Sequence, residues 1–228
     1  MKGILLSGSY KKIEIEEHVI NFIKNNTFEK RSICFIGADF EDYFLTDKLT
    51  NKLINIFLEA GLNFSNIYVI DKRIKKNEMI NYIESSDIVF LLGGDTLKQI
   101  KYIKNYGLTK YIKKSKIVMG ISAGAINMAK KVVLAKDIDD DIPELSIYNG
   151  IGISNINIEP HCDFENTEHF KDLIEASFVH EIILMTDNAY IIIDNDDYKY
   201  FGKFCVLNKG KVYFKDKLIT LDKFLEEE

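Results

Sequence analysis

Short apolar runs alternate with longer amphipathic stretches along the first half of the chain. The runs are rich in Ile, Val and Phe and show no strict alternation with polar residues, as expected of strands buried on both faces. We predict strands over residues 4–7, 32–37, 66–71, 87–94 and 116–122. The amphipathic stretches between them predict helices over residues 12–25, 45–60, 77–84 and 96–106.

Five strand–helix units in succession predict an α/β fold, with a mostly parallel sheet and helices on both of its faces. No linker rich in Pro, Gly or Ser interrupts the chain and no internal repeat is visible, so we expect a single domain over residues 1–228. In such sheets ligands bind beyond the carboxyl ends of the strands, and we expect the chemistry there.

The second half of the chain predicts strands of both orientations. We expect further strands over residues 155–159 and 181–186, with a helix over residues 168–178 between them. The tail predicts antiparallel strands over residues 190–194, 204–208 and 211–214, with turns at 195–197 and 209–210. We expect this tail to close one edge of the sheet.

Composition excludes several classes of function. A formal net charge of -5 and a pI near 5.5 leave no basic surface for nucleic-acid binding. No apolar run reaches the roughly 18 residues of a membrane span, and the first residues turn polar too early for a signal peptide. Cys34, Cys162 and Cys205 form no CxxC pair, which predicts neither a disulfide framework nor a zinc site. We therefore expect a cytoplasmic protein without a membrane partner.

One motif combines a strand, a sharp turn and a helix. Residues 120–125 read GISAGA, which is G-x-S-x-G, and residues 126–131 continue as a predicted helix. In such a nucleophile elbow, neighbours without bulk let strand and helix approach, and Ser122 is exposed at the sheet edge. The N–H of Ala123 then points to the same place, where it can donate to an oxyanion. The alternative is a tight turn in which Ser122 only caps the helix.

A second glycine turn lies one strand–helix unit earlier. Residues 90–96 read FLLGGDT, which ends a predicted strand and begins a helix that Asp95 or Thr96 is suited to cap. If the two strands are neighbours, this turn lies beside Ser122, and Gly94 can offer a second backbone N–H to a substrate. The alternative is an ordinary tight loop.

A histidine base has few candidates, because the chain has 4 histidines. Three occupy predicted helices, where a surface role suffices: His18, His169 and His180. His161 instead follows the predicted strand at 155–159 directly after Pro160, so its backbone is stiffened at a strand end. We therefore favour His161 as the base.

Two parts of the chain offer an acid that could orient this histidine. An acidic run lies between the serine and the histidine in sequence and has the composition of a solvated loop: Asp137, Asp139, Asp140 and Asp141. Asp187 instead follows the strand at 181–186, and a carboxylate fixed at a strand end holds an imidazole better than one on a loop. We favour Asp187, with Asp141 in reserve.

Together these motifs resemble the family of serine peptidases that includes aspartyl dipeptidase (peptidase E) and, more distantly, cyanophycinase. The resemblance rests on GGDT at residues 93–96, GISAGA at 120–125 and EPH at 159–161, followed by the strand before Asp187. It implies a three-layer α/β/α sandwich of the flavodoxin-like, class I glutamine amidotransferase-like type. It also implies a serine hydrolase that needs no cofactor and no metal.

The resemblance implies a role for seven residues: Ser122 as nucleophile, His161 as base, Asp187 as acid, Gly94 and Ala123 as oxyanion donors, and Gly93 and Asp95 in substrate binding. The chain also departs from the family. Asp95 stands where Asn is frequent, Asp187 where the dipeptidase has Glu, and Cys162 where an aromatic residue is common. Neither of its two arginines, Arg31 and Arg73, follows His161, although a bidentate grip on an aspartyl carboxylate favours Arg over Lys.

We therefore predict a serine peptidase that cleaves small peptides through an acyl-enzyme. Three alternatives remain: a non-catalytic binding domain of the same fold, a small-molecule esterase, and an amidotransferase-like glutaminase, a class that carries Cys at the elbow. The sequence predicts no oligomeric state.

Overall fold

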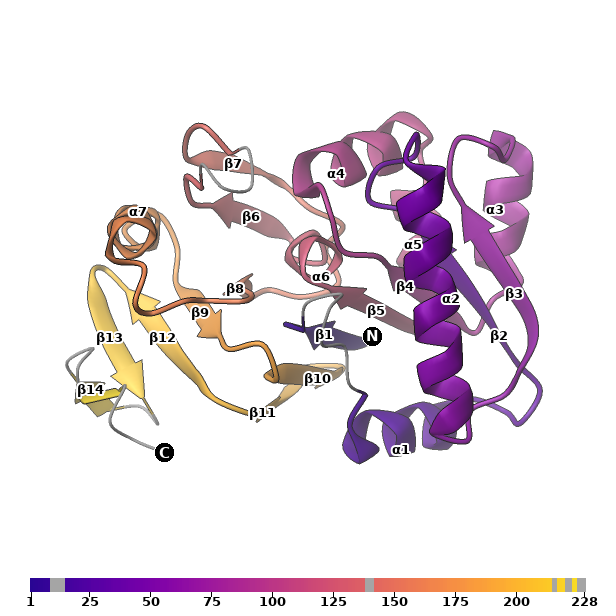
Figure 1. Cartoon of the computed structure of the whole chain (residues 1–228), viewed down its shortest axis with the longest axis horizontal. Helices are drawn as coiled ribbons and strands as arrows, with labels where there is room; N and C mark the ends of the chain where they lie inside the picture. Colours follow the sequence, from indigo (N-terminus) through magenta and orange to yellow (C-terminus); the bar gives the residue numbers. More distant parts are fainter. Residues whose placement is uncertain (9–14, 138–141, 215–216, 220–222, 225–228) are drawn as a thin grey trace.

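The main sheet has seven strands in the order β11-β10-β1-β5-β4-β2-β3 (Figure 1). The computed structural model describes residues 1–8, 15–137, 142–214, 217–219 and 223–224. Five strands run parallel: β1 (Lys2–Leu6), β2 (Arg31–Ile36), β3 (Phe64–Ile70), β4 (Ile88–Leu91) and β5 (Ile117–Ile121). Two antiparallel strands complete the edge beside β1: β10 (Tyr190–Asp194) and β11 (Asp197–Phe201). The predicted mostly parallel sheet is confirmed.

Successive side chains of a strand point to opposite faces of the sheet. Both faces of this sheet are apolar, and helices cover both of them. Ile33 and Phe35 of β2 pack in one apolar cluster, whereas Cys34 and Ile36 pack in another. The first cluster contains residues of α1 (Glu17–Asn26) and α2 (Tyr43–Glu59). The second contains residues of α3 (Lys76–Glu84), α4 (Thr96–Asn105) and α5 (Thr109–Ile112). The three layers are confirmed; residues 12–14 of the first predicted helix lie outside the described residues.

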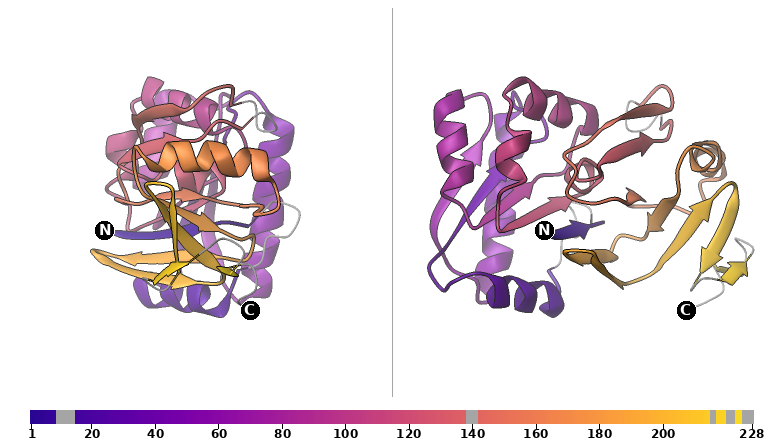
Figure 2. Two further views of the ribbon diagram at one scale, coloured as in Figure 1. Left: turned by 90° about the vertical axis from the view of Figure 1, so that its left-hand side faces the viewer. Right: turned by 180° about the vertical axis from the view of Figure 1, so that it is seen from behind.

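A second sheet of five strands lies beyond the β1 side of the main sheet, in the order β14-β13-β12-β9-β8 (Figure 2). Its strands are β8 (Asn157–Glu159), β9 (Ile182–Met185), β12 (Phe204–Asn208), β13 (Lys211–Phe214) and β14 (Lys217–Ile219). Together with α7 (Thr167–Ser177) it encloses a separate apolar core.

The prediction that the whole tail closes the main sheet is therefore wrong in part. Residues 190–201 do join its edge, but β12 pairs antiparallel with β9 instead, with Phe204 opposite Met185. The cause is burial: Leu184 of β9 and both Cys205 and Leu207 of β12 complete the core beneath α7.

The helix predicted over residues 126–131 is also wrong. The helix after the elbow, α6, spans only Ala123–Ile126, and the chain continues into β6 (Lys131–Leu134). This strand pairs with β7 (Ser146–Asn149) in a two-stranded sheet. The β-branched pair Val132 and Val133 favours a strand over a helix, and both side chains are buried.

None of the helices that the structure describes is long and apolar enough to span a membrane.

The start of α6 packs against β4 and β5 without room for side chains. A Cβ on Gly120 would lie 2.6 Å from the backbone of Gly124 and Ala125, and a Cβ on Gly124 would lie 2.2 Å from the carbonyl oxygen of Leu91. Atoms of a backbone cannot move aside as the tip of a side chain can. Both glycines of the elbow are therefore required by close approach.

We predict that Gly124→Ala lowers the free energy of unfolding by about 3 kcal/mol or more, since the new methyl overlaps a backbone oxygen. Gly3→Ala is the matched control, because its Cβ would meet only side-chain tips, at 3.2 to 3.3 Å, and should cost about 1 kcal/mol. Urea unfolding measures both, and equal losses would contradict the packing argument.

Candidate active site

Ser122 follows β5 in a strained conformation, with φ 50° and ψ -118°. A non-glycine residue with such angles costs about 1–3 kcal/mol, so surrounding contacts have to hold it. Its N–H donates to the carbonyl of Leu6 over 3.0 Å, and its carbonyl accepts from the N–H of Ile126 over 3.0 Å. The predicted elbow geometry is present, with Ser122 at the carboxyl end of β5.

The second glycine turn lies directly beside Ser122, because β4 and β5 are neighbours. A Cβ on Gly93 would lie 3.3 Å from the Cβ of Ser122. Gly94 has φ 135°, and a Cβ there would lie 2.9 Å from the Cβ of Ala38, so this position requires glycine. Within the described part of the chain, no backbone acceptor takes the N–H of Gly94 or of Ala123.

Asp95 caps α4, as one of the two predicted capping candidates. Its carboxylate accepts the N–H of Lys98 over 2.8 Å, and the Lys98 ammonium lies 3.5 Å from it and 2.9 Å from Asp39. A carboxylate at a helix N-cap is stabilised by the unpaired N–H groups there. The side chain of Asp95 is thus engaged with its own helix.

His161 and Asp187 meet across the ends of β8 and β9. The Nδ1 atom of His161 lies 2.6 Å from Oδ1 of Asp187, which makes a short hydrogen bond. The histidine backbone has φ 56°, and its N–H donates to the hydroxyl of Ser7 over 3.0 Å. Since Asp187 occupies Nδ1, the other ring nitrogen of His161 remains for a proton transfer.

Ser7 is a buried residue that the sequence reasoning missed. Its hydroxyl accepts from the His161 N–H and lies 3.3 Å from the carbonyl of Met185, to which it donates. Its own N–H donates to the carbonyl of Ala189 over 3.0 Å. Its position at the end of the first predicted strand indicated that it lies at the sheet edge. Its partners could not be predicted, because His161 and Met185 are more than 150 residues away in sequence.

One predicted contact, that between Ser122 and His161, is not formed among the described residues. Ser122 Oγ forms no hydrogen bond with His161 among the residues described, although both backbones are anchored to consecutive residues of one segment, Leu6 and Ser7. Such contacts often tighten only when substrate binds. Of the other acid candidates, Asp139, Asp140 and Asp141 lie outside the described residues.

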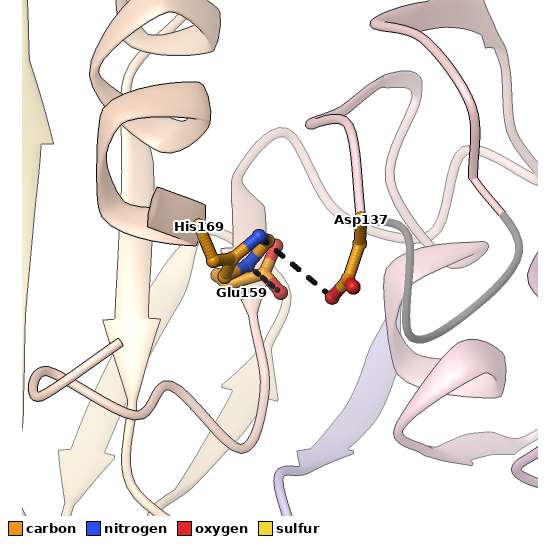
Figure 3. Close-up of side chains that lie close together, drawn as sticks. All are labelled: Asp137, Glu159 and His169. Carbon is orange, nitrogen blue, oxygen red and sulfur yellow. Dashed lines mark hydrogen bonds and ion pairs between the residues drawn. The ribbon is translucent and has the colours of Figure 1, made fainter. Parts of the chain in front are cut away.

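A second histidine–carboxylate cluster lies nearby in sequence and joins Asp137, Glu159 and His169 (Figure 3). His169 Nε2 lies 3.3 Å from Glu159, and Nδ1 lies 3.7 Å from Asp137. One ligand atom from each residue falls within 4.8 Å of the others, so these residues could hold a metal ion. The sequence placed His169 near the start of the helix predicted over residues 168–178 and did not indicate contacts with Asp137 or Glu159.

The cysteines and arginines take no part in the site. Burial raises the pKa of the Cys162 thiol far above its ordinary value, although Cys162 adjoins His161 in sequence. A protonated thiol is a poor nucleophile. Arg73 is bound to Asp47 and Asp71, and Arg31 is buried and donates to Thr27.

A known protein family matches most of the chain. The sequence model of one protein family, described as Peptidase family S51, matches residues 4–201 of the chain. No curated protein sequence matches the chain significantly.

Two solved structures share the fold. A Listeria monocytogenes EGD-e protein assigned to peptidase E is 17% identical, with a TM-score of 0.64 over 88% of this chain and 97% of that chain. A peptidase from an acI-B1 actinobacterium is 14% identical, with a TM-score of 0.67 over 96% of this chain and 93% of that chain. At such identities the likeness establishes the fold alone. Since the family match spans most of the sequence, the chain belongs to peptidase family S51 and is a serine-type peptidase.

Proposed function

We propose that this peptidase is dipeptidase-like and cleaves small peptides through an acyl-enzyme, with Ser122, His161 and Asp187 as its catalytic residues. The observation that carries the proposal is the joint anchoring of Ser122 and His161 to the end of β1, with His161 already bonded to Asp187. The activity needs no metal or cofactor in this proposal, because these three side chains suffice for acyl transfer.

In the proposed reaction, Ser122 Oγ attacks the peptide carbonyl while the free ring nitrogen of His161 takes its proton. His161 then gives this proton to the leaving amine, and water releases the acyl group with His161 as base again. Asp187 holds the imidazole in the tautomer with hydrogen on Nδ1 and stabilises the imidazolium.

The oxyanion of the tetrahedral intermediate is proposed to lie between the N–H groups of Gly94 and Ala123. Both adjoin Ser122, one through the neighbouring glycine turn and one through the elbow itself. Two such donors in fixed positions stabilise charge only as it develops, and losing one typically costs about 10²–10³ in rate.

Substrate contact is proposed for Gly93 and Asp95, which flank Gly94 in the same turn. An aspartyl preference is not part of the proposal, because both arginines are bound to other side chains. The three free cysteines are buried, which accords with a cytoplasmic location, also proposed here, and speaks against an amidotransferase that attacks through a thiolate.

Covalent labelling tests the assignment of the nucleophile. A fluorophosphonate probe should label the wild-type chain once, at Ser122, because an activated serine hydroxyl displaces fluoride at phosphorus. Ser122→Ala should abolish the labelling, and His161→Ala should slow it by at least about 10⁴-fold. Intact-mass measurement gives the rate of labelling, and peptide mapping gives its position. Labelling of Ser122→Ala at the wild-type rate would contradict the assignment of Ser122 as the nucleophile.

A panel of substrates then distinguishes a peptidase from an esterase and from a binding domain. Dipeptides, including Asp-Xaa members, should be hydrolysed, and Ser122→Ala should lose at least about 10⁴-fold in rate. Hydrolysis of short acyl esters without any dipeptide would favour an esterase, and a chain that neither labels nor hydrolyses would be a binding domain.

A further prediction tests the anchor of His161. Ser7→Ala should slow labelling of Ser122 by about 10- to 100-fold, because the His161 N–H loses the acceptor that fixes its position. Unfolding stability should fall by about 1–3 kcal/mol as buried polar groups lose their partners.

Ser177→Ala is the matched control for Ser7→Ala. Ser177 is also buried, donates to the carbonyl of Ile174 and accepts from the N–H of Gly210, far from His161 in sequence. It should lose a similar stability yet keep the labelling rate. If both variants label alike, Ser7 only stabilises the fold.

A further inference from the structure

His169 joins three segments that are separate in sequence. It lies in the first turn of α7, where the side chain of Asn166 caps the helix by accepting the His169 N–H. Its ring reaches Glu159 at the end of β8 (Figure 3). The ring also reaches the backbone of Lys136 after β6. The His169 side chain is 13% exposed and that of Glu159 is 14% exposed, so the contact is largely shielded from water.

The contacts of the two ring nitrogens define the charge of His169. Nδ1 lies 3.2 Å from the carbonyl of Lys136, and Nε2 lies 3.3 Å from a carboxylate oxygen of Glu159. A carbonyl and an ionised carboxylate can only accept, so the ring satisfies both contacts when both of its nitrogens donate, as they do in an imidazolium. The hydrogen bond to Glu159 accordingly raises the pKa of His169 to about 9, against the opposing effect of burial.

The surrounding charges are mixed, and the two acids dominate. The positive end of the α7 dipole disfavours a cation in the first turn. Glu159 and Asp137 offset it, because one ligand atom of each carboxylate lies within 4.8 Å of a ring nitrogen of His169. Among the described residues, further charged groups line the adjoining cavity of about 520 Å³: Lys136, Glu168, Lys171 and Asp172.

Each ring nitrogen of His169 lies at hydrogen-bond distance from a different acceptor. Metal binding would instead need one ring nitrogen with its lone pair free. A metal ion is therefore a rival that an experiment can separate from the imidazolium.

The cluster is connected to the proposed base through two peptide bonds. Glu159 ends β8, Pro160 follows with its fixed φ, and His161 comes next with φ 56°. A short, stiff connection transmits a shift of Glu159 to His161. Displacement of a reacting group by about 1 Å can cost 10²-fold in rate.

We propose that His169 is a positioning residue, whose imidazolium holds the end of β8 against α7 and the segment at residues 136–137 and so fixes His161. This role rests on the proposed function. Because the charge performs it, activity should depend on the protonation of a histidine that never touches substrate.

The test is the rate of fluorophosphonate labelling of Ser122 between pH 6 and 10. His169→Gln should slow labelling by about 10- to 100-fold at pH 7.5, because a neutral amide cannot replace the imidazolium. The wild-type rate should decline above pH 9, where His169 loses its charge, and this decline should be absent in His169→Gln. Glu159→Gln, which keeps the shape of the side chain, should also slow labelling.

The pH dependence of the stability of the same proteins tests the direction of the pKa shift of His169. A pKa raised from 6.5 to about 9 contributes stability that is complete below pH 6.5 and is lost as the pH rises to 9. Wild type should therefore lose more stability over this interval than His169→Gln does. Thermal melting at each pH also establishes that the variants are folded.

His180→Gln is the control, since His180 is exposed and its ring bonds only to the carbonyl of Glu181 among the described residues. It should label as wild type does. A His169→Gln variant that labels at the wild-type rate, or that is slow yet keeps the decline above pH 9, would overturn the proposal. Loss of wild-type labelling on EDTA treatment with recovery in Zn²⁺ would also overturn it, in favour of a metal site. A wild type that does not label at all refutes the proposed function, and the positioning role with it.

Discussion

One buried hydroxyl, that of Ser7, joins the two sheets on which the proposed catalytic groups are built. Ser122 and both glycine turns belong to the main sheet, whereas His161 and Asp187 follow β8 and β9 of the second sheet. Ser7 ends β1 of the main sheet, and its hydroxyl binds the backbone of His161 and of Met185. Its neighbour Leu6 accepts the Ser122 N–H. The distance between nucleophile and base is therefore set by how the two sheets meet at this residue.

Local sequence was enough to predict the main sheet. Its five parallel strands lie within a few residues of the predicted ranges, because buried strands and amphipathic helices have different periodicities. The elbow was also predictable as a motif, since Gly120 meets the backbone of Gly124 and Ala125 within six residues, whereas the demand on Gly124 comes from Leu91 of the neighbouring strand. Capping of α4 by Asp95 belongs to the same class of local effect.

The contacts between distant segments were not predictable from the sequence. The strands at 204–208 and 211–214 were expected at their observed positions but in the wrong sheet, because pairing depends on which edge offers a partner. Ser7 and His169 were missed as site-building residues for the same reason. Each gains its role from partners brought together by the fold, Met185 and His161 for one and Glu159 for the other.

Two histidines of this protein each bind a carboxylate, and their surroundings suit them to opposite tasks. The His161 side chain is 31% exposed and uses one ring nitrogen on Asp187, which leaves the other able to accept a proton. The His169 side chain is 13% exposed, each of its ring nitrogens faces an acceptor and its pKa is raised to about 9, so near neutral pH it is a poor proton acceptor. A general base must be both reachable and able to take up a proton, whereas a structural cation must be neither. Burial and the number of acceptors thus separate the proposed base from its positioning partner, although the two pairs are chemically alike.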